Sequence, residues 1–485
     1  MLRGIGWSVG QNLSSQLVST LVFVVLTRLL DARDFGLVAY ASVFISFVQM
    51  FVEQGIPDAI VQGKDLEDED FDAAFWCNLA LSLVLAALVF IAAPFAGAHL
   101  HEPRLAAILP WLGLALPLSG LASVQGALLR RQMHYRPLAI RTIFGTVGGG
   151  IAGVAMACLG FGVWSLVGQM LANSIIAVIV TWSVTEWRPR WRLSWYRLRR
   201  LRGFAMHVTA SAFLDYFNRR ADDFLIGFYL GPVVLGYYSV AYKVLLTLTR
   251  LLTSPLNSVA LAAFSRLQAD RDAFRQVFFR CARGAAYSAF PVFLGVLAVA
   301  PEFVNVCFGR QWSASIPVLR ILCLIGLLHS VAFLHGTALR ALGRANWQMW
   351  FTLGGALTNV AGFLFAVRYG ISAVAAAYVL SGYAWLAVDL ALLRSALGIS
   401  IAPYLRRLAL PAAASVAMAV AVLLTRHLYV ERVSDGWSLV IGSSIGAVAF
   451  TVIVCLADRS IPELAISLWH RLCRPSTQAA QPAIS

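Results

Sequence analysis

Polar side chains follow one face of each of two apolar segments near the middle of the chain. At about 100° per residue, the first stripe spans roughly 120° of a helix and the second roughly 80°. The first stripe holds His207, Ser211, Asp215, Asn218, Arg219 and Asp222, and the second holds Ser239, Lys243, Thr247, Arg250, Ser254 and Asn257. Charged groups inside a bilayer are costly unless they face one another, water or a ligand. The stripes therefore predict a polar cavity between two helices, suited to a hydrophilic, anionic ligand.

The two stripes differ in how their charges can be neutralised. Asp215 precedes Arg219 by four residues and Arg219 precedes Asp222 by three, so these side chains can pair along one helix face. This stripe is either a self-neutralised structural network or a network that exchanges its pairs with a ligand anion or a coupling proton. The second stripe holds Lys243 and Arg250 without an acid. These cations need Asp215 or Asp222 as a partner, or a bound phosphate or pyrophosphate.

The remaining ionisable residues give weaker signals. Asp389 is isolated within a late apolar span, and His329 and His335 are expected to be core histidines with satisfied hydrogen bonds. The seven cysteines show neither close pairing nor metal-ligand spacing, and the acidic run at 64–72 is expected to be a solvated loop. The sequence also lacks a phosphate-binding loop of the GxxxxGKS/T kind. No metal or cofactor is predicted, and transport would draw on an ion gradient or the membrane potential.

The composition places these stripes in a membrane. The chain is 60% hydrophobic and 13% charged, with a mean hydropathy of +0.76, which is too apolar for an ordinary water-soluble protein. Apolar runs of about 20 residues predict about fourteen membrane spans. They lie near residues 5–28, 36–60, 74–97, 106–129, 140–160, 163–183, 204–230, 234–260, 284–301, 314–338, 346–367, 371–393, 408–425 and 437–457. The predicted fold class is an all-α polytopic membrane protein.

The basic residues predict how the chain is oriented. Most of the Lys and Arg outside the spans lie in alternate connections, with four arginines at 130–141 and seven at 188–202. By the positive-inside rule, both termini are expected in the cytoplasm. The formal charge of +15 then follows from topology, so nucleic acid is not a predicted partner. Anionic membrane lipids are the predicted partner of the Arg- and Trp-rich connection at 187–202.

The spans before and after this connection resemble each other. Leu30, Gly36 and Ala41 recur as Leu230, Gly236 and Ala241, at an offset of 200. Further on, GALLR at 126–130 corresponds to GTALR at 336–340, and the turn at Gly162 to the one at Gly370. We expect two pseudo-symmetric six-helix lobes around a central cavity, followed by two C-terminal helices, with the ligand between the lobes. The predicted boundaries are an N-terminal lobe at 1–186, a basic linker at 187–203, a C-terminal lobe at 204–396, a two-helix extension at 397–460 and a tail at 461–485.

The repeat extends the predicted cavity to the first helix. Gln11, Ser15 and Ser19 occupy the positions of Ser211, Asp215 and Arg219, so the two helices are expected to present equivalent polar faces across one cleft. The alternative is that Ser and Gln only mediate helix packing. The predicted substrate-binding residues are Lys243, Arg250 and Arg219, and the predicted cavity or ion-coupling residues are Asp215, Asp222, Ser211, Gln11 and Ser15.

Six ordered blocks within residues 1–400 resemble one known family. They lie at 26–47 (LTRLLDARDFGLVAYASVFISF), 126–141 (GALLRRQMHYRPLAIR), 160–171 (GFGVWSLVGQML), 216–243 (YFNRRADDFLIGFYLGPVVLGYYSVAYK), 255–270 (PLNSVALAAFSRLQAD) and 308–322 (FGRQWSASIPVLRIL). The chain resembles bacterial polysaccharide flippases of the Wzx type, in the multidrug/oligosaccharidyl-lipid/polysaccharide superfamily, and is most similar to the colanic-acid-exporter-like branch.

The resemblance implies a fold of twelve to fourteen helices in two lobes around a cationic cavity, with alternating access. It implies transfer of an undecaprenyl-diphosphate-linked oligosaccharide to the periplasmic leaflet of the bacterial inner membrane, for lipopolysaccharide or exopolysaccharide biosynthesis. A polysaccharide polymerase and export machinery are implied partners. Family patterns place an acid at Asp222 and a basic residue at Lys243, whereas Arg219 stands where Asn is common.

Three other functions remain open at this stage. A drug or metabolite antiporter of the same superfamily is less favoured, because two cations on one helix suit a diphosphate better than a cationic drug. A peptidoglycan-precursor flippase would share the diphosphate. A membrane glycosyltransferase or polymerase would be expected to show a large external loop or an acidic catalytic motif, and the sequence shows neither, so an enzyme is not predicted. The sugar and the coupling ion are not identified by the sequence.

Overall fold

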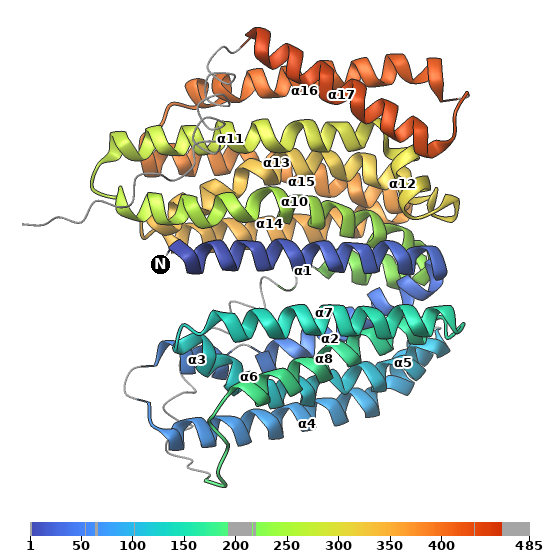
Figure 1. Cartoon of the computed structure of the whole chain (residues 1–485), viewed down its shortest axis with the longest axis vertical. Coiled ribbons are helices and arrows are strands. Elements are labelled where there is room, and N and C mark those ends of the chain that lie inside the picture. Colours follow the sequence, from blue (N-terminus) through green and yellow to red (C-terminus); the bar gives the residue numbers. More distant parts are fainter. Residues whose placement is uncertain are drawn as a thin grey trace, which may run out of the picture.

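The computed structural model describes residues 2–53, 55–63, 66–100, 102–192, 216, 220–430 and 432–457, with side chains from residue 15 onward except those at 258, 345 and 348. Within these ranges the chain forms long helices and no strand, which confirms the all-α prediction (Figure 1). The helices are α1 (Leu2–Leu29), α2 (Ala32–Glu53), α3 (Ile56–Gln62), α4 (Asp68–His99), α5 (Pro103–Gly113), α6 (Ala115–Arg131), α7 (Tyr135–Cys158), α8 (Val163–Val184), α10 (Pro232–Arg266), α11 (Arg271–Ala298), α12 (Ala300–Cys307), α13 (Ser315–Ala341), α14 (Ala345–Ala366), α15 (Ile371–Leu397), α16 (Ile401–Tyr429) and α17 (Asp435–Ala457).

Twelve segments of the described chain are long and apolar enough to cross a membrane. They coincide with twelve of the predicted spans, and the span near 106–129 consists of α5 and α6 together. The two other predicted spans are near 5–28, where Ser15–Leu29 forms a shorter apolar helix, and near 204–230, which is described only at 216 and 220–230. The protein is therefore a multi-pass membrane protein, while the count of fourteen stays a prediction.

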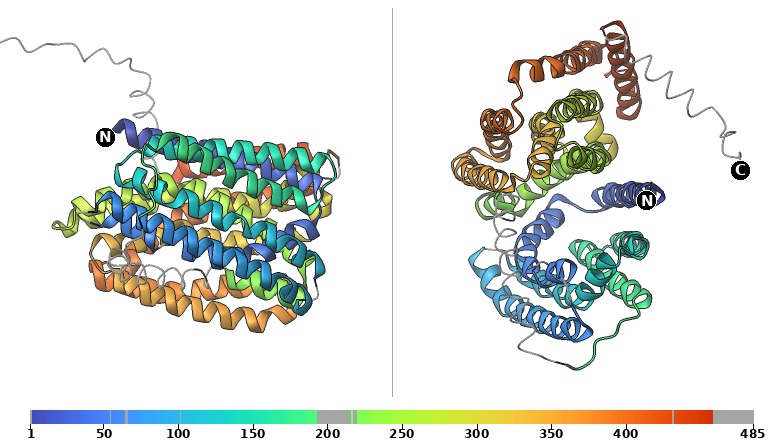
Figure 2. Two further views of the ribbon diagram at one scale, coloured as in Figure 1. Left: turned by 90° about the horizontal axis from the view of Figure 1, so that it is seen from below. Right: turned by 90° about the vertical axis from the view of Figure 1, so that its left-hand side faces the viewer.

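The helices pack in two groups, visible in the end-on view of Figure 2. Helices α2 and α4 to α8 pack on one another, and α10, α11 and α13 to α17 form the other group. Helix α1 lies along α7 and also reaches α10. This grouping agrees with the proposed repeat, but the lobe boundaries at 186 and 204 stay predictions, because 193–215 lie outside the described residues.

Helices α2 and α10 meet through two reciprocal glycine contacts. A Cβ atom placed on Gly36 would lie 1.6 Å from the carbonyl oxygen of Pro232, and one on Gly236 would lie 1.9 Å from the carbonyl oxygen of Ala32. The offset of 200 that relates Gly36 to Gly236 also relates Ala32 to Pro232, so each contact is the counterpart of the other. Small residues allow two helix backbones to approach this closely. The two groups therefore touch along their backbones where α2 and α10 begin.

Large apolar side chains continue this contact into a buried core. Leu37, Tyr40 and Ile45 of α2 belong to one cluster with Leu235 and Tyr238 of α10, and each of these side chains is almost fully buried. Burial of side chains of this size contributes about 1.5–3 kcal/mol each relative to exposure. The contact between the two groups is thus apolar and tightly packed at this end.

The end of α1 is held by polar contacts to residues 306–312, which lie at the end of α12 and before α13. The indole of Trp312, fully buried, donates a hydrogen bond to the carbonyl oxygen of Thr27 (2.8 Å), and Gln311 donates to the same oxygen (2.8 Å). In the other direction, Arg28 donates to the carbonyl oxygens of Cys307 (3.2 Å) and Val306, at the C-terminal end of α12, where a cation is favoured.

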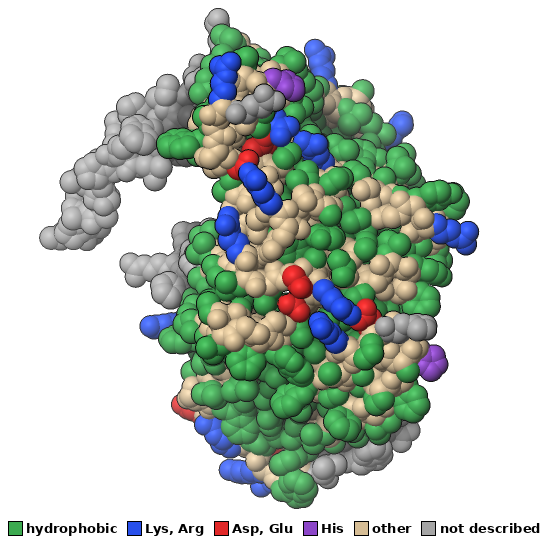
Figure 3. Space-filling model, turned by 90° about the vertical axis from the view of Figure 1, so that its right-hand side faces the viewer, with side chains coloured by type: hydrophobic (Ala, Val, Ile, Leu, Met, Phe, Trp, Pro, Cys, Tyr) green, Lys and Arg blue, Asp and Glu red, His purple; other side chains and the backbone are tan. Residues whose placement is uncertain are grey.

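Figure 3 looks onto this end of the molecule, where α1 ends and α2 begins. Charged side chains gather in a small group near the middle of a largely hydrophobic surface. Two ion pairs belong to the connections at this end, Arg33 with Glu102 (3.2 Å) and Arg310 with Asp435 (3.4 Å). Exposed pairs of this kind contribute about 0–1 kcal/mol. The closure of this end depends chiefly on the apolar and backbone contacts of α2 and α10.

The glycine contacts make a direct prediction. Gly36→Ala places a methyl group against the Pro232 carbonyl, so α2 and α10 have to separate, and we expect a loss of about 1–3 kcal/mol in stability. The loss should appear as a lower melting temperature of the purified protein. Gly284→Ala is the matched control, since nothing lies within 4 Å of its Cβ position on α11. An unchanged melting temperature for Gly36→Ala would contradict the contact.

Candidate functional site

The cationic stripe lies on α10, the longest described helix, which runs unbroken for 35 residues. Apolar neighbours such as Val240, Val244 and Leu245 are buried and hold one side of the helix in the core. The stripe lies on the less buried side: Lys243 is half-buried and Arg250 is exposed. The apolar face of α10 therefore positions the cations away from the core, as the helical periodicity requires.

No hydrogen bond or ion pair links Lys243 or Arg250 to any residue that the structure describes. The charged groups that act on Lys243 are Arg250 and Arg220, and both repel its ammonium group. Buried or half-buried cations without a counter-charge are unfavourable unless a ligand or water solvates them. The geometry of the described residues thus leaves a cationic site on α10 that can accept an anion.

Asp222 has partners other than these cations. Its side chain is buried, and its carboxylate accepts hydrogen bonds from the hydroxyl of Tyr238 (2.7 Å) and from the backbone N–H of Asp223 (2.9 Å). The neighbouring Asp223 pairs with Arg220 at 2.9 Å. The structural alternative, in which Asp222 neutralises Lys243 or Arg250 directly, is not formed among the described side chains.

Several predicted site residues lie outside the described part. Ser211, Asp215 and Arg219 are not described, and Gln11 is described only as part of the α1 backbone. Ser15 is half-buried on α1. The predicted shared face of the first helix and the segment at 204–230, and the pairing of Arg219 with its neighbours, stay predictions.

The polar stripe of α10 continues onto α13 through residues that sequence reasoning did not single out. Thr337 donates a hydrogen bond to Oδ1 of Asn257 (2.8 Å), and Arg340 donates to the Thr337 hydroxyl (3.2 Å). Both α13 residues belong to the GTALR segment, so the repeat was the signal that could have indicated them. Arg340 adds a third cation to the same polar surface.

A buried hydrogen-bonded triad connects α13, α15 and α16. His335 bonds through Nδ1 to the carboxylate of Asp389, and its Nε2 lies 2.7 Å from the hydroxyl of Tyr404. The prediction that His335 is a satisfied core histidine is confirmed. The prediction that Asp389 is isolated is wrong, because a late span and a residue 54 positions earlier meet only in the folded bundle.

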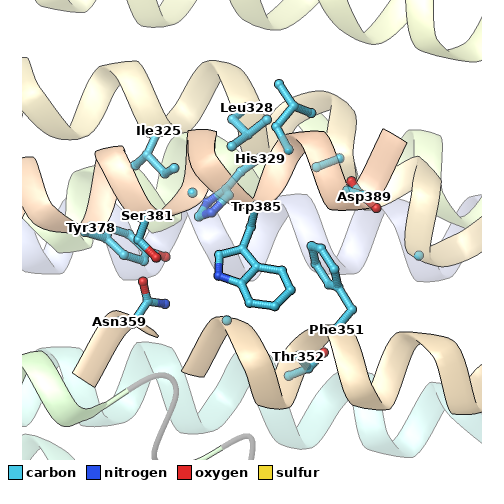
Figure 4. Close-up of a pocket in the computed structure, with 15 residues that line it drawn as sticks. Ile325, Leu328, His329, Phe351, Thr352, Asn359, Tyr378, Ser381, Trp385 and Asp389 are labelled. Atoms are coloured by element: carbon cyan, nitrogen blue, oxygen red, sulfur yellow. The ribbon is translucent and has the colours of Figure 1, made fainter. Parts of the chain in front are cut away.

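A cavity of about 200 Å³ lies beside this triad, between α13, α14 and α15. Figure 4 shows aromatic side chains, among them Phe351 and Trp385, around it together with polar groups such as Asn359 and Ser381. His329 also lines this cavity, so it is not solely a core residue. Sequence reasoning missed the cavity, since its lining comes from three separate helices.

The triad predicts an unequal response to two substitutions. Asp389→Ala removes the carboxylate that His335 bonds and leaves a buried polar group unsatisfied, which costs about 1–3 kcal/mol. Arg310→Ala removes an ion pair whose Arg side chain is 86% exposed, so the loss should stay below about 1 kcal/mol. Thermal unfolding of the purified variants measures both. Equal melting temperatures for the two variants would contradict a stabilising role of the triad.

The fold and the site together define a polytopic membrane transporter. Residues 25–317, more than half of the chain, match the family described as "Polysaccharide biosynthesis protein". The chain belongs to this family of polysaccharide biosynthesis proteins, and it is a transporter rather than an enzyme.

Curated relatives extend the comparison over most of the chain. The succinoglycan biosynthesis transport protein ExoT of Rhizobium meliloti is 27% identical over 95% of this chain and 93% of its own length. The lipopolysaccharide biosynthesis protein WzxC of Escherichia coli is 25% identical over 73% and 72% of the two chains. The teichuronic acid biosynthesis protein TuaB of Bacillus subtilis is 22% identical over 76% and 77%.

Solved structures show which fold this is. The lipid II flippase MurJ, in an inward closed conformation, matches with a TM-score of 0.77 over 93% of this chain and 98% of its own, at 14% identity. An inward-facing multidrug transporter of the MATE family matches with a TM-score of 0.63 over 79% and 94% of the two chains, also at 14% identity. At these identities the match defines the fold of the chain.

Proposed function

We propose that this protein flips an undecaprenyl-diphosphate-linked oligosaccharide repeat unit from the cytoplasmic to the periplasmic leaflet of the bacterial inner membrane. The product would feed lipopolysaccharide or exopolysaccharide biosynthesis, with a polymerase and export machinery as downstream partners. The names of the relatives, succinoglycan transport and lipopolysaccharide biosynthesis among them, support the substrate class. The fold shared with a lipid II flippase supports the mode of transport.

The observation that carries this proposal is the pair of cations on α10. Lys243 and Arg250 lie seven residues apart, two helical turns, and no described acid pairs with either of them. Ammonium and guanidinium groups bind phosphate oxygens through charge-assisted hydrogen bonds. The diphosphate that links the lipid to the sugar would supply the missing negative charge.

The contact of α2 with α10 supports an alternating-access cycle. It closes one end of the bundle through two glycines and apolar side chains, which can separate without breaking ion pairs inside the membrane. Opening of that end would release the head group to the other side. The energy would come from an ion gradient or the membrane potential.

Two transport alternatives are weaker. A drug antiporter would bind a cationic or apolar compound, and positive charges on the cavity helix oppose a cation. A peptidoglycan-precursor flippase shares the diphosphate and the fold, but the likeness to MurJ is one of fold at 14% identity, and the curated relatives are named for other polymers.

Substitution of the two cations tests the proposal. Lys243→Ala and Arg250→Ala should abolish transfer of a lipid-linked oligosaccharide in proteoliposomes with an imposed potential and no ATP, while the amount of protein stays unchanged. Arg266→Ala, on the opposite face of α10, is the control and should transfer as the wild type does. A strict need for ATP, or wild-type transfer by the Lys243→Ala, Arg250→Ala double variant, would contradict the proposal.

The orientation has its own test. Both termini and the 187–202 connection should lie in the cytoplasm, because the connections on that side carry most of the Lys and Arg. Reporter fusions after residues 195 and 478 should be active only with a cytoplasmic reporter. Activity of a periplasmic reporter at either position would reverse the orientation.

A further inference from the structure

The buried triad of His335, Asp389 and Tyr404 reaches the cavity between α13, α14 and α15, because Asp389 lines that cavity. In Figure 4, Asp389 lies toward one end of the cavity, and Asn359 and Ser381 lie toward the other. A cavity of about 200 Å³ has room for several water molecules, and its amide and hydroxyl groups can hydrogen-bond them. Carboxyl and imidazole groups in such a place mark a pathway for protons in membrane proteins.

The hydrogen bonds of the triad determine where its protons lie. An ionised carboxylate only accepts hydrogen bonds, so Nδ1 of a neutral His335 donates to Asp389. Nε2 is then an acceptor, and the hydroxyl of Tyr404 donates to it (2.7 Å). Tyr404 thereby holds the imidazole with its N–H toward the carboxylate. In this arrangement the triad carries one negative charge, on Asp389.

The helices packed around the triad present mostly apolar side chains to it. Phe278 of α11 contacts the rings of both His335 and Tyr404, at 5.9 Å between ring centroids. Helix α10 contributes Ala260 and Phe264 to the same apolar core, and α14 contributes aromatic or neutral side chains to the described cavity lining. The titratable side chains one helical turn from these contacts, or on the cavity wall, are Arg275 and Cys281 of α11, Arg407 of α16 and His329 of α13.

The two arginines of this set are held by other partners. Arg275 pairs with Asp272 at 3.1 Å, and the guanidinium of Arg407 lies 4.1 Å from the centroid of the Phe279 ring. Among the residues that the structure describes, no Lys or Arg pairs with Asp389. A carboxylate whose partner is a neutral histidine keeps its full charge, and a charge inside a membrane bundle is costly. Addition of a proton would remove that charge.

The repeat indicates that packing alone does not require an ionisable pair at these positions. At the offset of 210, His335 corresponds to Gln125 of α6, and at the offset of 208, Asp389 corresponds to Thr181 of α8. Gln125 and Thr181 are both buried, and the Thr181 hydroxyl donates to the carbonyl oxygen of Ala177 in its own helix (2.6 Å). The first group of helices therefore packs with neutral side chains where the second group has a histidine and a carboxylate.

The donor atoms of the triad suit a proton better than a metal cation. Hard metal cations take about six oxygen ligands, whereas the centre of this triad is an imidazole ring. The described part of the chain also contains no group of three or more His, Cys, Asp or Glu side chains that could hold a metal ion. The chemistry of the site is thus that of a carboxyl group exchanging a proton with water.

We propose that the triad of His335, Asp389 and Tyr404 is the proton-coupling site of this transporter. A proton from water in the cavity adds to the carboxylate of Asp389 and makes it a neutral carboxylic acid, while His335 keeps its Nδ1 proton and Tyr404 its hydroxyl proton. The charge-assisted hydrogen bond between α13 and α15 is thereby replaced by a weaker neutral one. The two helices can then shift relative to each other at a lower cost in free energy.

This inference rests on the proposed function and deepens it. It makes the proton the coupling ion for transfer of the lipid-linked glycan, and it assigns the binding of that proton to a site apart from Asp215 and Asp222. Asp389 holds the proton, whereas His335 and Tyr404 position and stabilise the carboxylate.

Infrared difference spectra of the purified full-length protein, between acidic and alkaline buffer, test proton binding directly. The wild type should show the C=O band of a buried, protonated carboxyl group, and Asp389→Asn should lack it. Asp272→Asn is the matched control, since it removes a carboxyl group on α11 whose side chain is 84% exposed, and it should keep the band.

Transfer of a lipid-linked oligosaccharide in proteoliposomes tests the coupling. A pH gradient should speed transfer by the wild type and by Asp272→Asn, and a pH-sensitive dye inside the vesicles should record the accompanying movement of protons. Asp389→Asn should lose both the stimulation and the proton movement. Its melting temperature reports whether it is folded, and inorganic pyrophosphate should still raise that temperature, because the cations of α10 are unchanged.

A second variant keeps the test decisive if Asp389→Asn does not fold. The double variant His335→Gln, Asp389→Thr carries the residue types of the first group at both positions. Because Gln125 and Thr181 occupy the equivalent buried positions there, the double variant should fold, and it should show neither the infrared band nor the proton movement.

Three results would overturn the assignment: the infrared band persists in folded Asp389→Asn, the pH gradient still speeds transfer by that variant, or a sodium gradient and not a pH gradient drives the wild type. If Asp389→Asn removes the band but the wild type does not transfer the lipid-linked oligosaccharide, the proposed function fails and proton binding by Asp389 stands. If the wild type transfers the oligosaccharide without any response to a pH gradient, the coupling site fails and the proposed function stands.

Discussion

The close approach of α2 and α10 is the interaction on which the rest of this structure depends. Gly36 and Gly236 let the two helices touch along their backbones, and no larger residue fits either position without moving a carbonyl group. This contact joins the two groups of helices and sets the rotation of α10. Because one side of α10 is committed to the apolar core, Lys243 and Arg250 have to lie on the other side, where the described residues offer them no acid.

The polar groups of the bundle fall into two classes with different consequences. Asp222, His335 and Asp389 are buried and satisfied by partners, so they stabilise the packing of particular helices. Lys243 and Arg250 make no hydrogen bond or ion pair with any residue that the structure describes, and the charges that act on Lys243 are positive. An uncompensated cation in a membrane protein is unfavourable, which makes these two the positions where an anionic substrate would contribute most.

The fold class and most spans could be predicted from the chain alone, because apolar runs of sufficient length have few alternatives in a bilayer. Twelve segments confirm this. The cationic stripe could also be predicted from the sequence, since helical periodicity places Lys243 and Arg250 on one face of the helix. The pairing of Asp389 with His335 could not be predicted in this way, and neither could the cavity between α13, α14 and α15, because the residues involved come from separate helices.

The sequence by itself determined what is local: the helices, the faces on which charges lie, the family and the recurrence of Gly36 as Gly236. These depend on periodicity and residue type, which a linear pattern contains. The tertiary structure alone decided which polar groups find partners. Asp222 binds Tyr238 and Asp389 binds His335, while the charges that act on Lys243 are positive. Such outcomes depend on how separate helices approach one another in space, and spacing along the chain does not specify that.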